Sequence, residues 1–481
     1  MDTIESRFEA DTNQDRLVIH KCYLAKQLEN LGDYEEARLA LEGIWSVMGE
    51  RPLVAGLAPA TKAELLLRVG SLSGWIGSAQ QIPHAQEFAK DLIAESARIF
   101  ASLGQQENAV EAQTDLAICY WRAGALEEAS VWFQEALSRA TSVENRVRIL
   151  INKAIIEIFA NRVDEALNQL NQASPLLDQV KDHATHGRYH MQRAIAFKRL
   201  GGSDNLDRAL IENAAASFHL EQARHRRYLA RVENNIAFIL MEVARHDEAI
   251  EHLDRARQMF TALKDSGSLA QVNETRARVF LAQKRYADAQ EAAAAAVMIL
   301  EQGDEQSLIA AALATQGIAL AQLGQHQASA DCFSRSVRIA EMAGDQVTAA
   351  RARLTAVEQL KDFLSPTDLL DLYLEADERI GHSPDADSVK YLRLAARVAI
   401  GVAQRTRSIE DLLAVISLKD EVRRYEGELI KRAMDKTEGQ ITNAARLLGI
   451  THQGLCEMLK TRHKNLRTKP PRSRQRSPDS L

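Results

Sequence analysis

Small residues recur along the chain at a regular interval. One of them opens the second helix of each predicted hairpin, at Ala129, Ala166, Ala209, Ala249, Ala289 and Ser329. The steps between them are 37, 43, 40, 40 and 40 residues. Another small residue follows seven positions later each time, and the position four later is often large, as at Phe133 and Leu170. Because positions i, i+4 and i+7 share one face of a helix, the pattern predicts helices that each press a stripe of small side chains against a neighbour.

Residues that favour turns separate these stripes. They lie five positions ahead of most of the repeated residues, at Gly124, Asn161, Ala244, Lys284 and Gly324. Only one proline, Pro175, occurs between His84 and Ser365, as expected of a helical region. Two helices in about every 40 residues predict an all-α protein, an α-solenoid of helical hairpins, with its regular array over 105–360.

The segment Arg122-Ala-Gly-Ala-Leu-Glu-Glu-Ala129, followed by Phe133 and Ala136, resembles the tetratricopeptide-repeat (TPR) family. Leu31-Gly-Asp-Tyr-Glu-Glu-Ala37 resembles it too. The family's usual period of about 34 residues is shorter, so the hairpins here are predicted to be longer, as in bacterial regulators with TPR-like sensor domains. The resemblance extends from Arg16 to Leu360 and implies a concave surface that binds a protein, a peptide or a small ligand.

Residues 1–104 are predicted to hold one TPR-like hairpin and an irregular helical segment. Within that segment, Gly70, Gly74 and Gly77 lie at i, i+4 and i+7. One interpretation is a phosphate-binding loop, but the chain contains no Gly-Lys dipeptide, which excludes a Walker A motif. The other interpretation, which we prefer, is a helix face left bare for close packing.

Candidate chemistry in the array is sparse. His183, His186 and His190 share one helical face at i, i+3 and i+7, a spacing that suits a transition metal. No convincing cysteine or carboxylate completes that face, so we interpret it as the surface of a helix start. No nucleophile motif is present, and the four widely spaced cysteines are expected to be reduced. The sequence therefore predicts a cytoplasmic protein that is not an enzyme, with no cofactor, no metal and no membrane partner.

The distribution of charge sets the C-terminal end apart. Residues 420–481 hold 14 Lys and Arg against 8 Asp and Glu, although the whole chain has a net charge of −6. Capping and bridging helices are predicted over 361–419, with Ser365 and Pro366 starting one helix. Further helices are expected at 385–404 and 408–417. A basic end on an acidic body suits a terminus that meets a polyanion.

A compact helical module is predicted over 420–466. The first helix is expected to run to Lys436 and to pack Val422, Tyr425, Leu429 and Ala433 on one side. Gly439 ends it, Thr442 caps the next helix, and Ala444, Ala445 and Leu448 face inward. Gly449 forms a tight turn, Ile450 enters the core, and Thr451 caps a last helix that buries Leu455 and Leu459. Two short helices joined by a tight turn predict a helix-turn-helix.

This module resembles the Fis-type helix-turn-helix family. The matching residues include Tyr425-Glu426, Leu429-Ile430, the run Ile441 to Ile450, Gln453 and Lys460. The resemblance implies sequence-specific DNA binding by a homodimer at a palindromic site, with the long first helix helping to pair the subunits. The family often follows an ATPase of the sigma-54 activator type, whereas helical repeats occupy that place here.

The candidate DNA-binding residues lie at the helix starts and beyond the reading helix. They are Gln440, Thr442, Asn443, Thr451, His452, Gln453, Lys460, Arg462, His463 and Lys464. Gln453 suits adenine, and the residues at the helix starts suit phosphates. His452, Cys456, Glu457 and Met458 depart from the basic or aromatic residues that the family uses, and Glu457 would repel phosphate if it faced the DNA backbone.

Residues 467–481 are predicted to form a disordered basic tail. It is rich in Pro and Ser and carries Arg467, Lys469, Arg472, Arg474 and Arg476. Beside a helix-turn-helix we interpret it as a contact for phosphates, and its alternative role is to keep the end soluble.

Together these patterns predict a bacterial DNA-binding transcriptional regulator. The array senses or binds a protein or peptide ligand in its groove, and the helix-turn-helix binds an operator. The alternative is a TPR interaction adaptor whose Fis-like end serves dimerisation in place of DNA binding.

Overall fold

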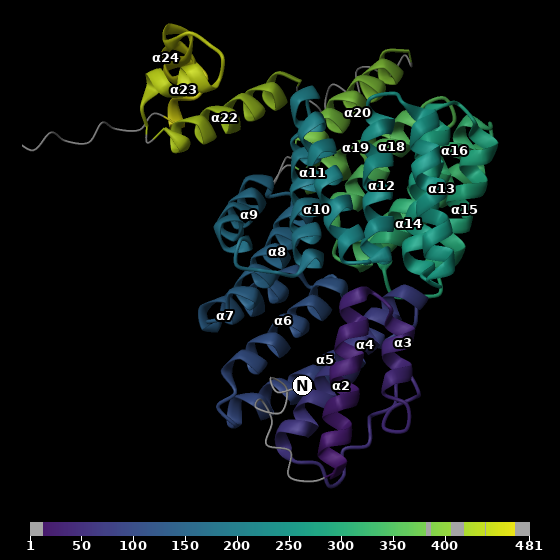
Figure 1. The fold of residues 1–481 in the computed structure, drawn as a ribbon. Helices are drawn as coiled ribbons and strands as arrows, with labels where there is room; N and C mark the ends of the chain where they lie inside the picture. The colour runs from purple at the N-terminus through teal and green to yellow at the C-terminus, as the bar shows by residue number, and fades with distance from the viewer. Residues whose placement is uncertain (1–12, 381–385, 406–417, 438, 467–481) are drawn as a thin grey trace, which may run out of the picture. The chain divides into compact units, whose positions relative to one another are not determined.

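A computed structural model describes residues 13–380, 386–405, 418–437 and 439–466 of the chain. The chain divides into two compact units, 1–399 and 400–481. The described residues form helices joined by turns and loops and include no β-strand (Figure 1), which confirms the all-α prediction. Among them no helix is both long enough and apolar enough to span a membrane. The predicted domain boundaries at 104/105, 360/361, 419/420 and 466/467 remain predictions.

The first unit is an array of helical hairpins. The first helices of the hairpins are α6 (Gln106–Arg122), α8 (Val143–Phe159), α10 (His183–Leu200), α12 (Arg226–Glu242), α14 (Ser266–Ala282), α16 (Gln306–Gln322) and α18 (Gln346–Gln359). The second helices are α7 (Leu126–Arg139), α9 (Val163–Leu177), α11 (Ser203–Gln222), α13 (His246–Ala262), α15 (Tyr286–Leu300), α17 (His326–Met342) and α19 (Pro366–Ile380). Successive first helices contact one another from α6 to α18, so they line one continuous surface.

The repeated small residues form the seams of these hairpins. All six positions from Ala129 to Ser329, and the six small residues seven positions later, are fully buried. The large residues between them, such as Phe133 and Leu170, are buried as well. The turn residues predicted ahead of them all adopt positive φ, from 58° at Asn161 to 84° at Gly124. The period read from the sequence therefore corresponds to the observed hairpins.

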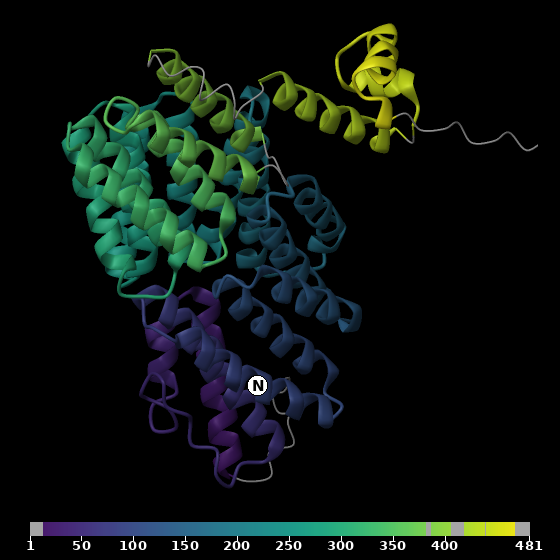
Figure 2. The same ribbon diagram turned by 180° about the vertical axis from the view of Figure 1, so that it is seen from behind.

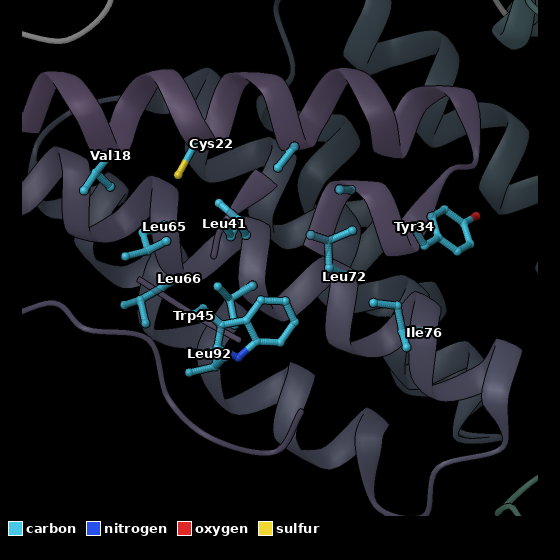
Figure 3. Packing of buried hydrophobic residues seen from close by; sticks show 13 residues of the cluster. Val18, Cys22, Tyr34, Leu41, Trp45, Leu65, Leu66, Leu72, Ile76 and Leu92 are labelled. Atoms are coloured by element: carbon cyan, nitrogen blue, oxygen red, sulfur yellow. The ribbon is translucent and has the colours of Figure 1, made fainter. Parts of the chain in front are cut away.

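Before the regular array, the chain forms α2 (Asn13–Leu31), α3 (Tyr34–Ala40), α4 (Pro59–Gln80) and α5 (Ala85–Ser102). Figure 3 shows Val18 and Cys22 of α2 facing Leu65 and Leu66 of α4, with Trp45 filling the space beside them. Each of these side chains is at most 3% exposed. This cluster holds α2 and α3 against α4 and α5.

The glycines of α4 serve packing. A Cβ atom placed on Gly77 would lie 2.1 Å from the Cβ of Ala85, and one on Gly70 would lie 2.6 Å from Ile93 Cγ1. Any side chain there would push α5 away from α4. The bare helix face is therefore confirmed.

The first unit also makes contacts between segments far apart in sequence. Helix α4 contacts α14, and in both views the purple N-terminal helices lie against the ends of the teal helices (Figures 1 and 2). Gly267 at the start of α14 has room for no side chain, because a Cβ there would lie 2.4 Å from the Ser78 backbone oxygen. The N-terminal hairpins thus close against the middle of the array.

Helix α19 completes the last hairpin with α18, and α20 (Ala386–Arg405) follows it. Ser365 caps α19 as predicted, with its Oγ accepting a hydrogen bond from the backbone N–H of Asp368 at 3.2 Å. The helix expected at 385–404 corresponds to α20, and the one expected at 408–417 lies outside the described residues. The predicted basic tail at 467–481 lies outside them too. The second unit contains α22 (Leu418–Lys436), α23 (Ile441–Leu447), α24 (His452–Thr461) and a short 3-10 turn, η1 (Lys464–Leu466).

Candidate nucleic-acid interface

Three helices of the second unit enclose a small apolar core. Its buried members are Ile430, Ala433, Met434, Ala444, Ala445, Leu455 and Leu459. Ala444 and Ala445 let α23 approach both neighbours, while the two leucines fix one face of α24. That packing leaves the opposite face of α24 to solvent, which is the arrangement that a reading helix requires.

Glycines with positive φ form the turns of this unit. Gly439 has φ of +80° and donates its N–H to Met434 O at 2.8 Å, which closes the end of α22. Gly449 has φ of +66° between α23 and α24. Thr451 then caps α24, because its Oγ1 accepts a hydrogen bond from Gly454 N at 3.1 Å. These three predictions are confirmed.

Two local predictions were wrong. Thr442 does not cap α23, because the helix already begins at Ile441 and Gln440 occupies the N-cap position without a side-chain cap bond. Gln440 Oε1 instead accepts a hydrogen bond from Asn443 Nδ2 at 2.6 Å. Ile450 does not enter the core and is 39% exposed, because the positive φ of Gly449 directs the chain outward before α24 begins.

The predicted stripe on α22 was wrong in part. Ala433 is buried, but Val422, Tyr425 and Leu429 are exposed by 50%, 36% and 39%. Ile430 and Met434 take the inward positions instead. A row of apolar side chains at i, i+3 and i+7 is therefore uncovered within a single copy of this unit.

Nine of the ten candidate DNA-binding residues are exposed. On α24 the exposed face carries His452, Gln453 and Lys460 together with Glu457. The carboxylate of Glu457 shares this face, so it opposes the attraction that Lys460 exerts on phosphate. Thr451, whose hydroxyl is engaged in the cap, lies at the start of the same helix.

The residues after α24 fold back onto α22. His463 is 4% exposed, and its Nε2 lies 3.3 Å from Glu426 Oε2. Arg462 is exposed but pairs with the same carboxylate at 3.3 Å, and its backbone oxygen accepts from Arg423 Nε at 3.0 Å. His463 therefore stabilises the fold here and presents no surface to DNA, while Lys464 stays exposed.

One basic residue was not among the candidates. Arg446 is exposed in the last turn of α23 and has no carboxylate partner among the described residues. Its outward position follows from its neighbours, since Ala444 and Ala445 face the core. The helical periodicity of the sequence alone is enough to predict that Arg446 is exposed.

The histidines of the array also gather. His183 Nδ1 lies 2.9 Å from Nδ1 of His219 on α11, and the rings of His186 and His190 stack on that of His219. His190 Nδ1 contacts Glu212 Oε2 at 2.7 Å, and His186 contacts the Val180 oxygen. Across the described ranges, no group of three or more His, Cys, Asp or Glu side chains is arranged to hold a metal ion.

Three family models match parts of the chain. Residues 228–302 match the tetratricopeptide repeat, residues 85–202 match the 26S proteasome subunit RPN7, and residues 421–460 match the bacterial regulatory protein, Fis family. A comparison with curated proteins finds no significant match.

Solved structures similar to the chain are helical-repeat proteins. A Rap protein complexed with Competence and Sporulation Factor has a TM-score of 0.50 at 14% identity, covering 72% of this chain and 100% of its own. A signal transduction ATPase with numerous domains and a tetratricopeptide repeat sensor, from Pyrococcus horikoshii, has a TM-score of 0.45 at 14% identity, covering 77% of this chain and 64% of its own. The first likeness shows the fold alone. With the matched segments, it identifies the chain as a protein of tetratricopeptide-type helical repeats with a C-terminal Fis-family helix-turn-helix domain.

Proposed function

We propose that the protein is a DNA-binding transcriptional regulator of the bacterial cytoplasm. In this proposal the helix-turn-helix binds an operator and the helical-repeat array binds the ligand or partner that controls it. The observation that carries the proposal is the exposed face of α24, which stands on a packed core within the segment that matches the Fis family.

Base recognition is assigned to the start of α24. Gln453 and His452 lie exposed in its first turn, and a glutamine amide can bond bidentately to adenine in the major groove. Gln440, Thr442 and Asn443 are exposed around the start of α23 and are assigned to phosphates. Lys460, Lys464 and Arg446 add sequence-independent attraction.

The apolar row on α22 supports a homodimer. Val422, Tyr425 and Leu429 are large side chains left exposed on one helix, and a second copy of the same helix offers a complementary row. A two-fold dimer presents two reading helices related by symmetry, so its site on DNA is palindromic.

The test is binding of the full chain to a pool of genomic DNA at low salt, followed by mapping of the protected positions. We expect a specific protected site. Gln453→Ala should lower the preference for that site by about 1–3 kcal/mol. Lys464→Ala should weaken binding to all sequences and reduce the salt slope by about one unit.

Lys361→Ala, which removes an exposed lysine of the first unit, is the matched control and should change neither quantity. The absence of binding to any fragment in the pool at low salt would refute the regulator.

A second candidate function is an interaction adaptor whose Fis-like unit only dimerises. The observation that favours it is Glu457, an acidic residue exposed on the face that would meet DNA. Dimerisation by the full chain without measurable affinity for DNA would support the adaptor.

A further inference from the structure

The contact between the first hairpins and the middle of the array brings together an unusual set of side chains. Trp75 of α4 stacks on Tyr34 of α3 with ring centroids 5.4 Å apart. From the other side, α12 contributes Arg227, whose guanidinium lies 4.3 Å from the ring of Tyr34. Tyr228 is the next residue of α12 and is almost fully buried. Residues separated by nearly half the chain thus form one continuous surface.

Three arginines surround these aromatic rings, and we call them the arginine cluster: Arg122, Arg188 and Arg231. The guanidinium carbons of Arg188 and Arg231 lie 5.6 and 5.7 Å from the ring centroid of Tyr228. That of Arg122 lies 3.7 Å above the ring of Trp75. They come from α6, α10 and α12, so each belongs to a first helix of a hairpin.

The cluster has no carboxylate partner among the described residues. Arg122 donates one hydrogen bond, to the Gly74 backbone oxygen at 3.1 Å. Arg188 donates one to Asn152 Oδ1 at 3.0 Å. Arg231 lies beside the ring of Tyr228 and has no hydrogen bond or ion pair among the described residues. Since a guanidinium has five N–H donors, most of the donors in the cluster are unused by the protein.

Other arginines nearby form ion pairs with carboxylates. Arg68 pairs with Glu29 at 3.0 Å and with Glu111 at 2.5 Å. Arg148 pairs with Asp115, and Arg227 pairs with Asp265. The other buried arginines of this region are therefore paired with carboxylates, whereas the arginine cluster forms no ion pair within the described part of the chain.

The electrostatics follow from this imbalance. Burial of the Tyr228 ring raises its pKa, but the positive charges of Arg188, Arg231 and Arg122 outweigh burial and hold the pKa below its usual value. Burial raises the pKa of Glu305, and the positive charges of Arg122 and Arg231 also act on this pKa, to lower it. The Glu305 carboxylate accepts a hydrogen bond from Gln81 Nε2 at 3.1 Å and forms no ion pair with either arginine.

There is room beside the cluster. Arg122 lines an open cavity of about 230 Å³ together with Gln81 and Gln86. The carboxylates of Glu87, Asp304 and Glu305 line the same cavity. Among the described residues, the side-chain oxygens of both glutamines are buried without a hydrogen-bond donor. They can accept N–H or O–H groups from a molecule in the cavity, while the Arg122 guanidinium binds an acidic group of that molecule.

We propose that the arginine cluster binds an anionic ligand through carboxylate or phosphate groups. Guanidinium groups match the geometry of both anions, and the phenols of Tyr34 and Tyr228 have no hydrogen-bond partner of their own among the described residues. The proposal deepens the proposed function, because it assigns a chemical class to the ligand of the array. A ligand here would contact both the first hairpins and α12, so its binding would stabilise the closure between them.

The experiment is calorimetric titration of the full chain with inorganic pyrophosphate and, separately, with a tetraglutamate peptide, at about 0.15 M salt. We expect saturable binding of at least one probe. Arg231→Gln should weaken it about tenfold or more, as expected for the loss of a hydrogen bond to a charged group. Arg208→Gln is the matched control, because it removes the same charge from an exposed position on α11 and should leave binding unchanged.

Arg231 makes no ion pair or hydrogen bond with any residue that the structure describes, so its replacement is expected to leave the fold intact, which circular dichroism would check. If Arg231→Gln does not fold, Tyr228→Phe serves as the second variant. It keeps the aromatic ring but removes the phenol, and it should still weaken binding severalfold. Binding of pyrophosphate alone identifies a phosphate ligand, and binding of tetraglutamate alone identifies a carboxylate ligand.

The proposal is overturned if neither probe binds, if Arg231→Gln binds like the unaltered chain, or if Arg208→Gln weakens binding as much as Arg231→Gln does. These outcomes are independent of DNA. If the full chain does not bind DNA, the regulator proposal fails, but the measured binding of the anionic probes is unaffected.

Discussion

His225 is a single side chain that makes folding of the array depend on pH. It caps α12, because its Nδ1 accepts a hydrogen bond from Tyr228 N at 3.2 Å, and it is 3% exposed against Gly32. Burial, together with the charges of Arg188, Arg227 and Arg231, lowers its pKa from 6.5 to about 3. The folded chain therefore holds this histidine neutral.

The sign of the effect follows from proton uptake. Between about pH 6.5 and pH 3 the unfolded chain binds a proton at His225 that the folded chain does not, so stability falls as pH falls. The loss approaches about 1.4 kcal/mol for each pH unit in that window. We expect His225→Asn, which can also cap a helix, to flatten the dependence of urea unfolding on pH below 6.5. Parallel curves for the two proteins would contradict this account.

At the scale of an element, the stability of a helix start depends on one hydroxyl group. Thr451 caps α24, whereas Thr442 lies inside α23 and makes no cap bond. Thr451→Ala should therefore cost about 1 kcal/mol, and Thr442→Ala should cost almost nothing. Hydrogen exchange of the α24 amides in the full chain should accelerate about fivefold in the first variant only. Equal acceleration in both would show that the cap does not hold α24.

Helix α22 has more apolar surface than its own unit covers. If a second copy packs on Val422, Tyr425 and Leu429, then Leu429→Glu places a charge in that interface. Loss of a buried leucine alone corresponds to about 1.5–3 kcal/mol. The dissociation constant of the dimer should therefore rise at least about tenfold. Sedimentation of the full chain measures this change.

Leu200→Glu makes the same substitution at an exposed leucine at the end of α10 and serves as the control. A chain that is monomeric before any substitution would rule out the dimer.

What the sequence can predict differs between elements. The hairpin seams and the turns were predictable, because a small residue such as Ala249 or a turn residue such as Gly324 acts within about 40 residues of chain. The core of the helix-turn-helix was predictable for the same reason. Ile450 and the stripe on α22 were not, because both depend on the angle at which the chain leaves a turn, and hydrophobic spacing does not specify that angle.

Closure of the array is a property of the whole first unit. It joins Gly32 to Arg227 and Gln81 to Glu305, pairs that lie 195 and 224 residues apart. The rotation between successive hairpins accumulates along a solenoid, so no local pattern indicates which helices meet after several repeats. The arginine cluster lies at this contact, which is why its members show no common spacing in the sequence.

Arg227 is the residue through which this closure can be tested. It is buried, donates from Nε to the Gly32 oxygen at 3.1 Å and pairs with Asp265. Arg227→Ala removes both contacts and leaves the Asp265 carboxylate, 3% exposed, without its cation. Breaking one side of a buried pair costs about 3–5 kcal/mol, and Trp75 fluorescence should report the loss during urea unfolding, since that ring stacks on Tyr34.

The decisive comparison is the double variant Arg227→Met with Asp265→Asn. Asparagine can keep the cap that Asp265 provides to Ser268 N at 2.9 Å, and it removes the unpaired charge. The double variant should therefore be more stable than Arg227→Ala, although the bond to Gly32 is absent from both. If the two variants unfold alike, the cost arises from the lost contact with Gly32 and Tyr34. Hydrogen exchange in α4 and α14 would then rise equally in both, and closure would depend on packing and on the Gly32 hydrogen bond more than on charge.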